Sequence, residues 1–258
     1  MVTLFTLAID WGIRPVLFRA GPFPVESYPV FVVLAVTVAL ALYYFSHRSR
    51  AQFNDSAFFI AVGAIFGGAL GAKLPIWIAN YQEILQAWPD VQLLLSGRTI
   101  VGGIVGGAIG VNLVKWRLNI KERRGNALVI PVCAGIAIGR IGCLLRGCCF
   151  GKPTHTNFGV NFGDGTLRHP TQAYEIIFVL LLMLYSLRKS STAHPGELWQ
   201  NFMIAYFSFR FFIEFIREEP VVAWHLTAFQ IASLCIAAYH IINFKIIPKF
   251  YAGSQSVS

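Results

Sequence analysis

The sequence predicts an all-α membrane protein that crosses a bilayer about seven times. Of its 258 residues, 56% are hydrophobic and only 13% are charged, whereas a soluble domain carries about 25% charged residues. The apolar residues form blocks, and several blocks approach the ~20 residues needed to cross a hydrocarbon core. Because lipid offers the backbone no hydrogen-bond partners, such blocks are expected to be helices, and the sequence shows no short alternating segments typical of a β-barrel.

The apolar blocks define the expected spans and one membrane domain over residues 1–258. The spans are predicted at 28–45, 57–80, 99–114, 127–145, 174–187, 198–217 and 226–244. The second and third carry glycines at spacings of three and four, which let helix backbones approach closely, so these two spans are expected to pack together. Residues 1–27 are interpreted as an N-terminal segment at the membrane interface.

Loop charge predicts the topology. The net charge of +9 does not indicate nucleic-acid binding, because the basic residues lie in short loops rather than on one polar face. The loop between the third and fourth spans, around Lys121, is densely basic. The positive-inside rule then places the C-terminus in the cytoplasm and the N-terminus outside. The longest connection, 146–172, becomes an outer-face loop, and its length favours a functional role.

Arg140 begins the first polar cluster, which runs from Gly139 to Gly151 at the outer end of the fourth span. It lies about one helical turn below the end of the span, where a guanidinium group is suited to bind a lipid phosphate bidentately. The alternative is an arginine whose side chain snorkels to the interface.

His169 begins the second cluster, at the entry to the fifth span. Thr171 is positioned to cap this helix, with Pro170 just before it. At the membrane surface a neutral imidazole accepts a proton, so His169 is a candidate base, with a plain interfacial histidine as the alternative.

The third cluster lies late in the sixth span. Tyr206, Arg210, Glu214 and Arg217 recur at spacings of four, four and three and are therefore expected to share one helix face. An Arg210–Glu214 pair lowers the cost of burying either charge, and Arg217 leaves the face positive, as an anion site requires. A purely structural pair is the alternative.

These motifs resemble, in order, those of the bacterial prolipoprotein diacylglyceryl transferase family. The resemblance is carried by five stretches of the chain: Thr99–Gly103, Gly139–Gly142 with Gly151, His169–Glu175, Phe209–Arg217 and Gln230. It implies a multi-pass enzyme of the bacterial plasma membrane that acts without a cofactor. Such enzymes move the diacylglyceryl group of phosphatidylglycerol to the lipobox cysteine of a prolipoprotein and release glycerol phosphate.

The polar clusters and the resemblance together define the candidate site. The catalytic candidates are His169, Arg140, Arg210, Glu214, Cys148 and Cys149. The substrate-binding candidates are Arg217, Tyr206, Gln172, Tyr174, Lys73, Gln230, Cys143, Gly139 and Gly151. Lys73 and Gln230 are the weakest, since a snorkelling lysine or a helix-packing glutamine explains either one. No metal ligand is assigned; the expected partners are a phospholipid and an acceptor thiol of a protein, or another small acceptor.

The chain also departs from the family's pattern, which indicates a divergent, cysteine-containing branch. Val101 stands where the family has a histidine, Cys143 replaces an asparagine and Cys148 replaces an acidic residue. Three roles stay open for the cysteines: small packed residues, a thiolate nucleophile, or a metal site completed by His155 or His169, against which the absence of a CxxC pair argues. Two other functions also stay open, a membrane thiol oxidoreductase and a non-catalytic lipid-binding paralogue.

Overall fold

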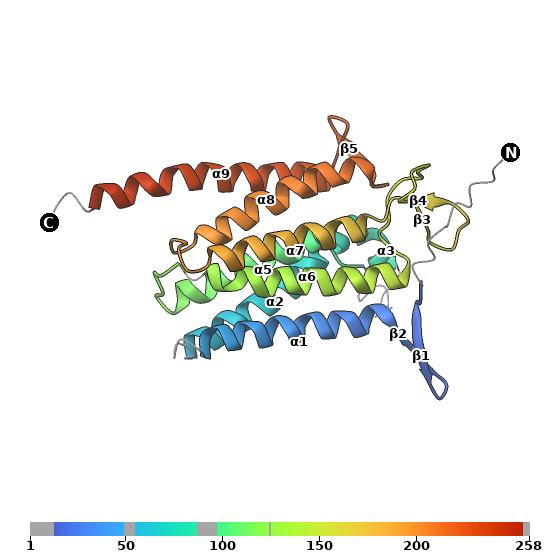
Figure 1. Ribbon diagram of the computed structural model, residues 1–258, viewed down its shortest axis with the longest axis horizontal. Coiled ribbons are helices and arrows are strands. Elements are labelled where there is room, and N and C mark those ends of the chain that lie inside the picture. Colours follow the sequence, from blue (N-terminus) through green and yellow to red (C-terminus); the bar gives the residue numbers. More distant parts are fainter. Residues whose placement is uncertain (1–12, 49–54, 87–96, 124, 255–258) are drawn as a thin grey trace. The chain divides into compact units, whose positions relative to one another are not determined.

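The computed structural model describes residues 13–48, 55–86, 97–123 and 125–254, and these are mostly helical (Figure 1). The helices are α1 Ser27–Arg48, α2 Asp55–Ala79, α3 Tyr81–Gln86, α5 Ile100–Arg117, α6 Asn126–Arg146, α7 Thr171–Lys189, α8 Glu197–Ile213, the 3₁₀ turn η1 Glu214–Ile216, and α9 Ala228–Ser254. Each predicted apolar block forms a helix. By length and composition α1, α2, α6 and α7 are able to cross a membrane.

The strands of the described chain pair as three antiparallel hairpins. They are β1 Val16–Ala20 with β2 Phe23–Glu26, β3 Val160–Asn161 with β4 Leu167–Arg168, and β5 Val221–Ala223 with β6 Leu226–Thr227. The first hairpin covers much of the predicted interfacial segment, of which residues 1–12 lie outside the described residues. Its exposed Phe18 and Phe23 side chains are compatible with an interface, and that location stays a prediction.

The chain divides into two compact units, one made of residues 44–123 and the other of the residues before and after them. The single-domain organisation therefore stays a prediction. In the 44–123 unit, α2 packs on α5 through glycines. A β-carbon on Gly63 would lie 2.8 Å from the Gly110 carbonyl oxygen, and one on Gly71 would lie 2.7 Å from the Gly106 Cα. This confirms the predicted close packing of the second and third spans.

In the other unit, α6 packs on α7, α8 packs on α9, and α6 also contacts α8. The interior combines aliphatic and aromatic side chains with an unusual number of polar ones. Phe202, Tyr206 and Phe207 of α8 are fully buried, as are Val129 of α6 and Val179 of α7. Because these three helices meet along this interior, polar side chains on their inward faces lie close together.

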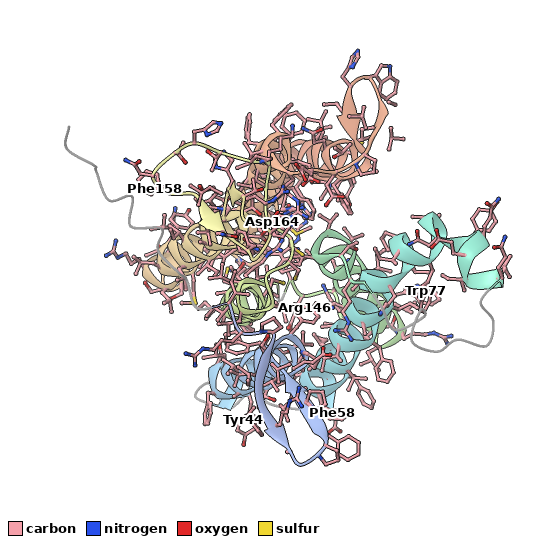
Figure 2. All side chains as sticks on the ribbon, turned by 90° about the vertical axis from the view of Figure 1, so that its right-hand side faces the viewer. Tyr44, Phe58, Trp77, Arg146, Phe158 and Asp164 are labelled. Atoms are coloured by element: carbon pink, nitrogen blue, oxygen red, sulfur yellow. The ribbon has the colours of Figure 1, made fainter. Side chains whose placement is uncertain are left out.

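The loop between α6 and α7, residues 147–170, is called the outer loop after its predicted location, and it is ordered by pairing within itself and with the segment after η1 at one end of this unit. Gly151 forms a bridge with Arg217, and Pro153 forms one with Arg168. The Lys152 amide donates to the Ile216 carbonyl at 2.7 Å. Figure 2 looks onto this end, where Asp164 and the exposed Phe158 lie on the loop.

Candidate active site

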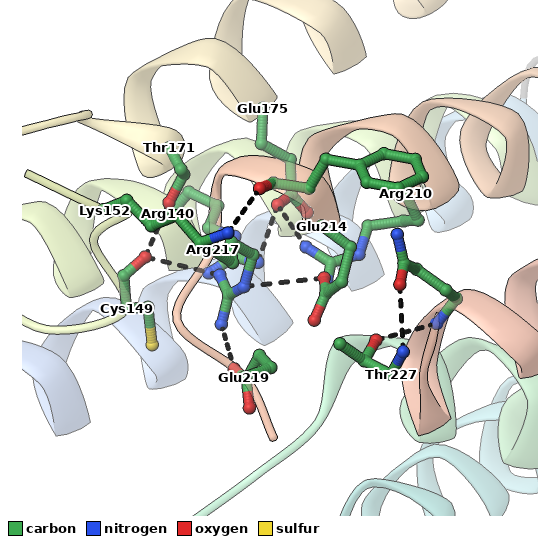
Figure 3. A network of polar contacts seen from close by, with 12 residues as sticks. Arg140, Cys149, Lys152, Thr171, Glu175, Arg210, Glu214, Arg217, Glu219 and Thr227 are labelled. Atoms are coloured by element: carbon green, nitrogen blue, oxygen red, sulfur yellow. Dashed lines mark hydrogen bonds and ion pairs between the residues drawn. The ribbon is translucent and has the colours of Figure 1, made fainter. Parts of the chain in front are cut away.

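Glu175, on the second turn of α7, is the centre of a buried charge cluster formed by Arg140, Glu175, Arg210, Glu214 and Arg217 (Figure 3). One of its carboxylate oxygens lies 2.6 Å from Arg140 Nη2 and 3.3 Å from Arg210 Nη1. The other accepts a hydrogen bond from the Tyr206 hydroxyl at 2.7 Å. A single buried carboxylate therefore links α6, α7 and α8, as burial of a charge requires.

Glu214 forms the second anionic centre, in the 3₁₀ turn that follows α8. Arg210 Nη2 donates to it at 3.0 Å, and Arg217 Nε lies 3.5 Å from the same oxygen. Arg210 therefore bridges the two carboxylates, one with each terminal nitrogen. The predicted Arg210–Glu214 pair is present.

The predicted single helix face is wrong at Arg217. The α-helix ends at Ile213, and Arg217 has extended backbone geometry, with φ −94° and ψ 154°. Its side chain still reaches the cluster, because the chain turns back through η1. Arg217 also donates to Glu219 at 2.8 Å and to the Cys149 carbonyl at 3.3 Å.

Arg140 does not snorkel to the interface. Only 4% of it is exposed, and it pairs with Glu175. The predicted capping role of Thr171 is also wrong, since α7 begins at Thr171 after Pro170 without a side-chain cap. The Thr171 hydroxyl instead donates to the Cys149 carbonyl at 2.7 Å.

The cluster carries unpaired hydrogen-bonding atoms. Three arginines and two glutamates leave it a formal charge of +1. Among the described residues, the buried Nε groups of Arg140, Arg210 and Arg217 and one oxygen of Glu214 have no hydrogen-bond partner. Buried polar atoms are paired in the great majority of cases, so these donors indicate a place for an anionic ligand.

His169 lies in the outer loop just before α7 and is half-buried. Its Nδ1 is 3.3 Å from the Tyr174 hydroxyl. Its backbone carbonyl accepts hydrogen bonds from the Gly151 and Thr171 amides, at 2.8 and 2.9 Å. His169 and Tyr174 are thus held together next to the segment that carries Cys149.

The three cysteines of the fourth-span motif lie close together. Gly147, with φ +74°, ends α6 in a Schellman motif: its amide bonds to the Leu144 carbonyl, and the Cys148 amide bonds to the Cys143 carbonyl at 3.1 Å. This motif brings the residues at its two ends into contact, here Cys143 and Cys148. The Cys149 Sγ lies 3.8 Å from the Cys148 Sγ, and all three sulfur atoms lie within 4.8 Å of one another.

The environment separates the acidities of the two loop thiols. Hydrogen bonds with Cys143 and Cys148, aided by Arg140 and Arg217, hold the pKa of Cys149 well below its usual value. For Cys148, a hydrogen bond with Cys143 lowers the pKa, but the hydrogen bond with Cys149 and burial outweigh it and raise the pKa to about 11. Cys149 is therefore the more acidic of the two.

The glycines of the motif have different surroundings. A β-carbon on Gly151 would lie 2.5 Å from the Ile216 carbonyl oxygen, and one on Gly142 would lie 2.7 Å from Phe31 Cβ. One on Gly139 would meet nothing within 4 Å. Neighbouring protein atoms therefore lie too close to Gly151 and Gly142 for a larger side chain, whereas the space beside Gly139 is open.

The remaining candidates are distributed differently. The Gln172 amide donates to the Cys148 carbonyl and is fully buried. Gln230 forms a capping box with Thr227 at the start of α9: its side-chain oxygen accepts from the Thr227 amide at 2.9 Å, and its own backbone amide donates to the Thr227 hydroxyl at 3.1 Å.

Two further residues lie in the 44–123 unit, where Lys73 is buried in α2 and Val101 is buried in α5. A substrate-binding role for Lys73 and Gln230 stays a prediction.

Glu175 belongs to the His169–Glu175 motif, but the sequence alone assigned it no role. It was detectable as an acidic residue one turn inside an apolar helix, where a charge requires a partner. Its partners were not detectable, because Arg140 and Arg210 are contributed by other helices.

Apolar helices of membrane length that enclose a net-positive arginine–glutamate cluster define a helical membrane protein with a buried polar site. The chain belongs to the prolipoprotein diacylglyceryl transferase family, whose sequence profile matches residues 15–246. It is accordingly an enzyme of the transferase class.

Named relatives agree with this assignment. The phosphatidylglycerol–prolipoprotein diacylglyceryl transferase of Clostridium tetani is 34% identical over 215 residues, which cover 80% of this chain and 86% of the relative. The enzyme of the same name from Dehalococcoides mccartyi is 29% identical over 251 residues, 91% of this chain and 92% of the relative. The phosphatidylglycerol–prolipoprotein diacylglyceryl transferase 2 of Clostridium perfringens is 31% identical over 222 residues, which cover 80% of this chain and 84% of the relative.

Proposed function

We propose that the protein transfers the diacylglyceryl group of phosphatidylglycerol to the cysteine thiol of a prolipoprotein. The relatives named above carry this activity in their names. The observation that supports it in this chain is the buried charge cluster, in which the Nε–H groups of three arginines have no hydrogen-bond partner. A phosphate diester is an anion with the oxygen acceptors that such donors lack.

The reaction requires charge stabilisation more than covalent assistance. The acceptor sulfur forms a bond to the terminal glyceryl carbon, and the carbon–oxygen bond to the phosphate breaks. The bonding electrons leave on the phosphate, which departs as glycerol phosphate, and the thiol proton passes to a base. Arg140, Arg210 and Arg217 would stabilise the charge on that departing phosphate, with Glu175 and Glu214 holding their guanidinium groups in place.

His169 is the proposed base. It lies in the segment whose backbone pairs with Gly151 and Lys152, and its contact with the Tyr174 hydroxyl orients the imidazole ring. Cys148 and Cys149 act through their carbonyls, which accept hydrogen bonds from Gln172, Thr171 and Arg217. As a covalent carrier Cys149 is disfavoured, because a diacylglyceryl thioether does not readily release its alkyl group to a second thiol.

The other proposed substrate-binding residues are Tyr206, Tyr174, Gln172, Cys143, Gly139, Gly151, Lys73 and Gln230. The open space beside Gly139 supports lipid contact there, and the unpaired side-chain oxygen of Gln172 supports a polar contact with a ligand.

We also propose that α1, α2, α5, α6, α7, α8 and α9 form seven spans of a bacterial plasma membrane. The C-terminus would then lie on the cytoplasmic side. The basic loops support this orientation. Two single-cysteine variants test it, each in a chain whose five native cysteines are replaced by serine: Asn157→Cys in the outer loop and Ser190→Cys after α7, both exposed positions. An impermeant maleimide should label the first in intact spheroplasts and the second only after permeabilisation. The reverse pattern would contradict the orientation.

The transfer itself is tested with purified protein, labelled phosphatidylglycerol and a lipobox peptide. Mass spectrometry should show a diacylglyceryl adduct on the peptide cysteine together with released glycerol phosphate. Arg140→Ala should abolish the adduct, whereas Arg188→Ala, an exposed arginine in the last turn of α7, should not. Folded protein that neither modifies the peptide nor turns over lipid would exclude the proposal.

Neither alternative function gains support from the described structure or the relatives. A thiol oxidoreductase would show redox-dependent thiol labelling and quinone reduction. A non-catalytic lipid-binding protein would bind phosphatidylglycerol through Arg210 without modifying the peptide.

A further inference from the structure

The thiol cluster, formed by Cys143, Cys148 and Cys149, is not used by the proposed reaction. Its sulfur atoms converge although the three residues lie in different local conformations: Cys143 in the last turn of α6, Cys148 just beyond the Schellman motif, and Cys149 at a positive φ of +63°. A left-handed conformation is uncommon for a residue with a β-carbon. It persists only where surrounding contacts enforce it.

Those contacts come from outside the cluster. The Cys149 carbonyl accepts from the Thr171 hydroxyl at 2.7 Å and from Arg217 Nη1 at 3.3 Å. The Cys148 carbonyl accepts from the buried Gln172 amide. The backbone is therefore held by α7 and by the segment after η1. This places the thiols together without any bond between them, and all three cysteines are free.

The spacing of the sulfur atoms matches a metal tripod. A tetrahedral ion with metal–sulfur bonds of about 2.3 Å places its sulfur ligands about 3.8 Å apart. The Cys148–Cys149 separation is 3.8 Å, and the largest separation in the cluster is within 4.8 Å. Small side-chain rotations would bring the three sulfur atoms within bonding distance of one ion. The missing CxxC spacing therefore does not exclude a metal site, because the Schellman motif brings Cys143 to Cys148.

A structural disulfide explains the cluster less well. Consecutive Cα atoms are about 3.8 Å apart, below the ~4.4–6.8 Å that disulfides span, so Cys148 and Cys149 are poorly placed to pair with each other. Any disulfide would need Cys143 and would leave one thiol unused. A metal ion uses all three.

We propose that Cys143, Cys148 and Cys149 bind one thiophilic d¹⁰ cation of the Zn²⁺ type through three thiolates, leaving a fourth coordination position open. Each thiol releases its proton to solvent on binding. No fourth protein ligand joins the three thiols among the described residues: His155 is exposed, and His169 faces Tyr174. The exposed side of Cys149 leaves the fourth position accessible.

A thiol is the ligand class that such an open position would take, and this connects the metal to the proposed transfer. A cation that bound the acceptor thiol would favour its thiolate form and would thereby assist His169, the proposed base, in taking the thiol proton. This connection rests on the proposed function, whereas metal binding itself does not.

The test uses the full-length protein in detergent, reduced and freed of metal, and then titrated with Zn²⁺ against a chromogenic chelator. We expect one Zn²⁺ per chain. Serine at any one of the three positions should weaken binding more than about 100-fold, beyond the 10–100-fold typical when a residue behind a ligand is replaced. Cys235→Ser, an exposed thiol on α9, is the matched control and should bind as the parent does. Binding that survives all three cluster variants, or no binding, overturns the site.

Titration of the parent protein with Co²⁺ makes the result independent of how the variants fold. Sulfur-to-cobalt charge-transfer bands together with the d–d bands of tetrahedral Co²⁺ would support binding by the three thiolates. The weak d–d bands of octahedral Co²⁺ would overturn it. Adding a lipobox peptide should then shift the Co²⁺ spectrum, while the same peptide with serine in place of cysteine should not. An unchanged spectrum with the cysteine peptide would overturn the connection to transfer and leave the metal site standing.

Discussion

Arg140 of α6 and Glu175 of α7 form a buried ion pair, with Nη2 and Oε2 2.6 Å apart and with side chains only 5% and 1% exposed. The pair joins two helices that are long and apolar enough to span a membrane. Because Arg210 and Tyr206 of α8 bond to the same carboxylate, Glu175 is both a structural link and the group that sets the charge of the site.

We predict that Glu175→Gln destabilises the protein while keeping its shape. The change leaves Arg140 and Arg210 without their shared carboxylate, and removing one partner of a buried pair costs about 3–5 kcal/mol. Thermal unfolding in detergent measures the loss. Glu219→Gln removes an ion pair of Arg217 at the edge of the cluster and should change stability by less than about 1 kcal/mol. Equal effects of the two variants would contradict a central role for Glu175.

We predict that Arg210→Lys lowers the transfer rate about 10²–10³-fold, the loss typical of one stabilising donor in a transition state. Lysine keeps the charge but offers a single nitrogen, whereas Arg210 bonds Glu175 and Glu214 with separate nitrogens. The steady-state rate with a lipobox peptide measures this, and Arg188→Lys is the exposed control. A rate near that of the parent would show that charge alone suffices.

We predict that Thr171→Val destabilises the loop that carries Cys149. The substitution keeps the shape of the side chain but removes the 2.7 Å hydrogen bond to the Cys149 carbonyl and leaves only the 3.3 Å bond from Arg217; one such hydrogen bond contributes about 0.5–1.5 kcal/mol. Limited proteolysis of the outer loop should become faster. Thr192→Val, whose hydroxyl makes only a 3.4 Å contact beyond α7, should not change it.

We predict opposite effects of alanine at two glycines of α6. At Gly142 the new methyl group would lie 2.7 Å from Phe31 Cβ, and overpacking costs about 1–3 kcal/mol. At Gly139 nothing lies within 4 Å, and alanine favours a helix over glycine by about 0.5–1 kcal/mol. Unfolding temperatures should therefore fall for Gly142→Ala and hold or rise for Gly139→Ala. A lower transfer rate in the stable Gly139→Ala variant would indicate lipid contact at that position.

We predict that the charge on Asp164 orders the tip of the outer loop. A hydrogen bond from Arg168, aided by the Thr166 amide, holds the pKa of Asp164 below its usual value. A carboxyl group with a lowered pKa stabilises the folded loop above its unfolded pKa of about 4, and the contribution disappears as pH falls through the folded pKa. At pH 7, Asp164→Asn should speed amide exchange in residues 161–168, and the difference from the parent should vanish in acid. Equal exchange at pH 7 would contradict this role.

Part of the site was readable from local sequence. Apolar blocks determine helices wherever they occur, so the long helices and the glycine contact between α2 and α5 follow directly. The Arg210–Glu214 pair follows from a spacing of four along one helix. The thiol cluster was also within reach, since the dipeptide Gly147-Cys148 after a helix places Cys148 against Cys143 through a Schellman motif.

The sequence by itself determined that the chain forms apolar helices bearing arginine, glutamate and cysteine motifs in a family-specific order. Only the tertiary structure decided which charges meet: Glu175 with Arg140 and Arg210, Arg217 after the end of α8, and Thr171 with the Cys149 carbonyl. The physical reason is that helix formation depends on neighbours three or four residues away, whereas a buried charge is stabilised by any partner that packing brings within bonding distance.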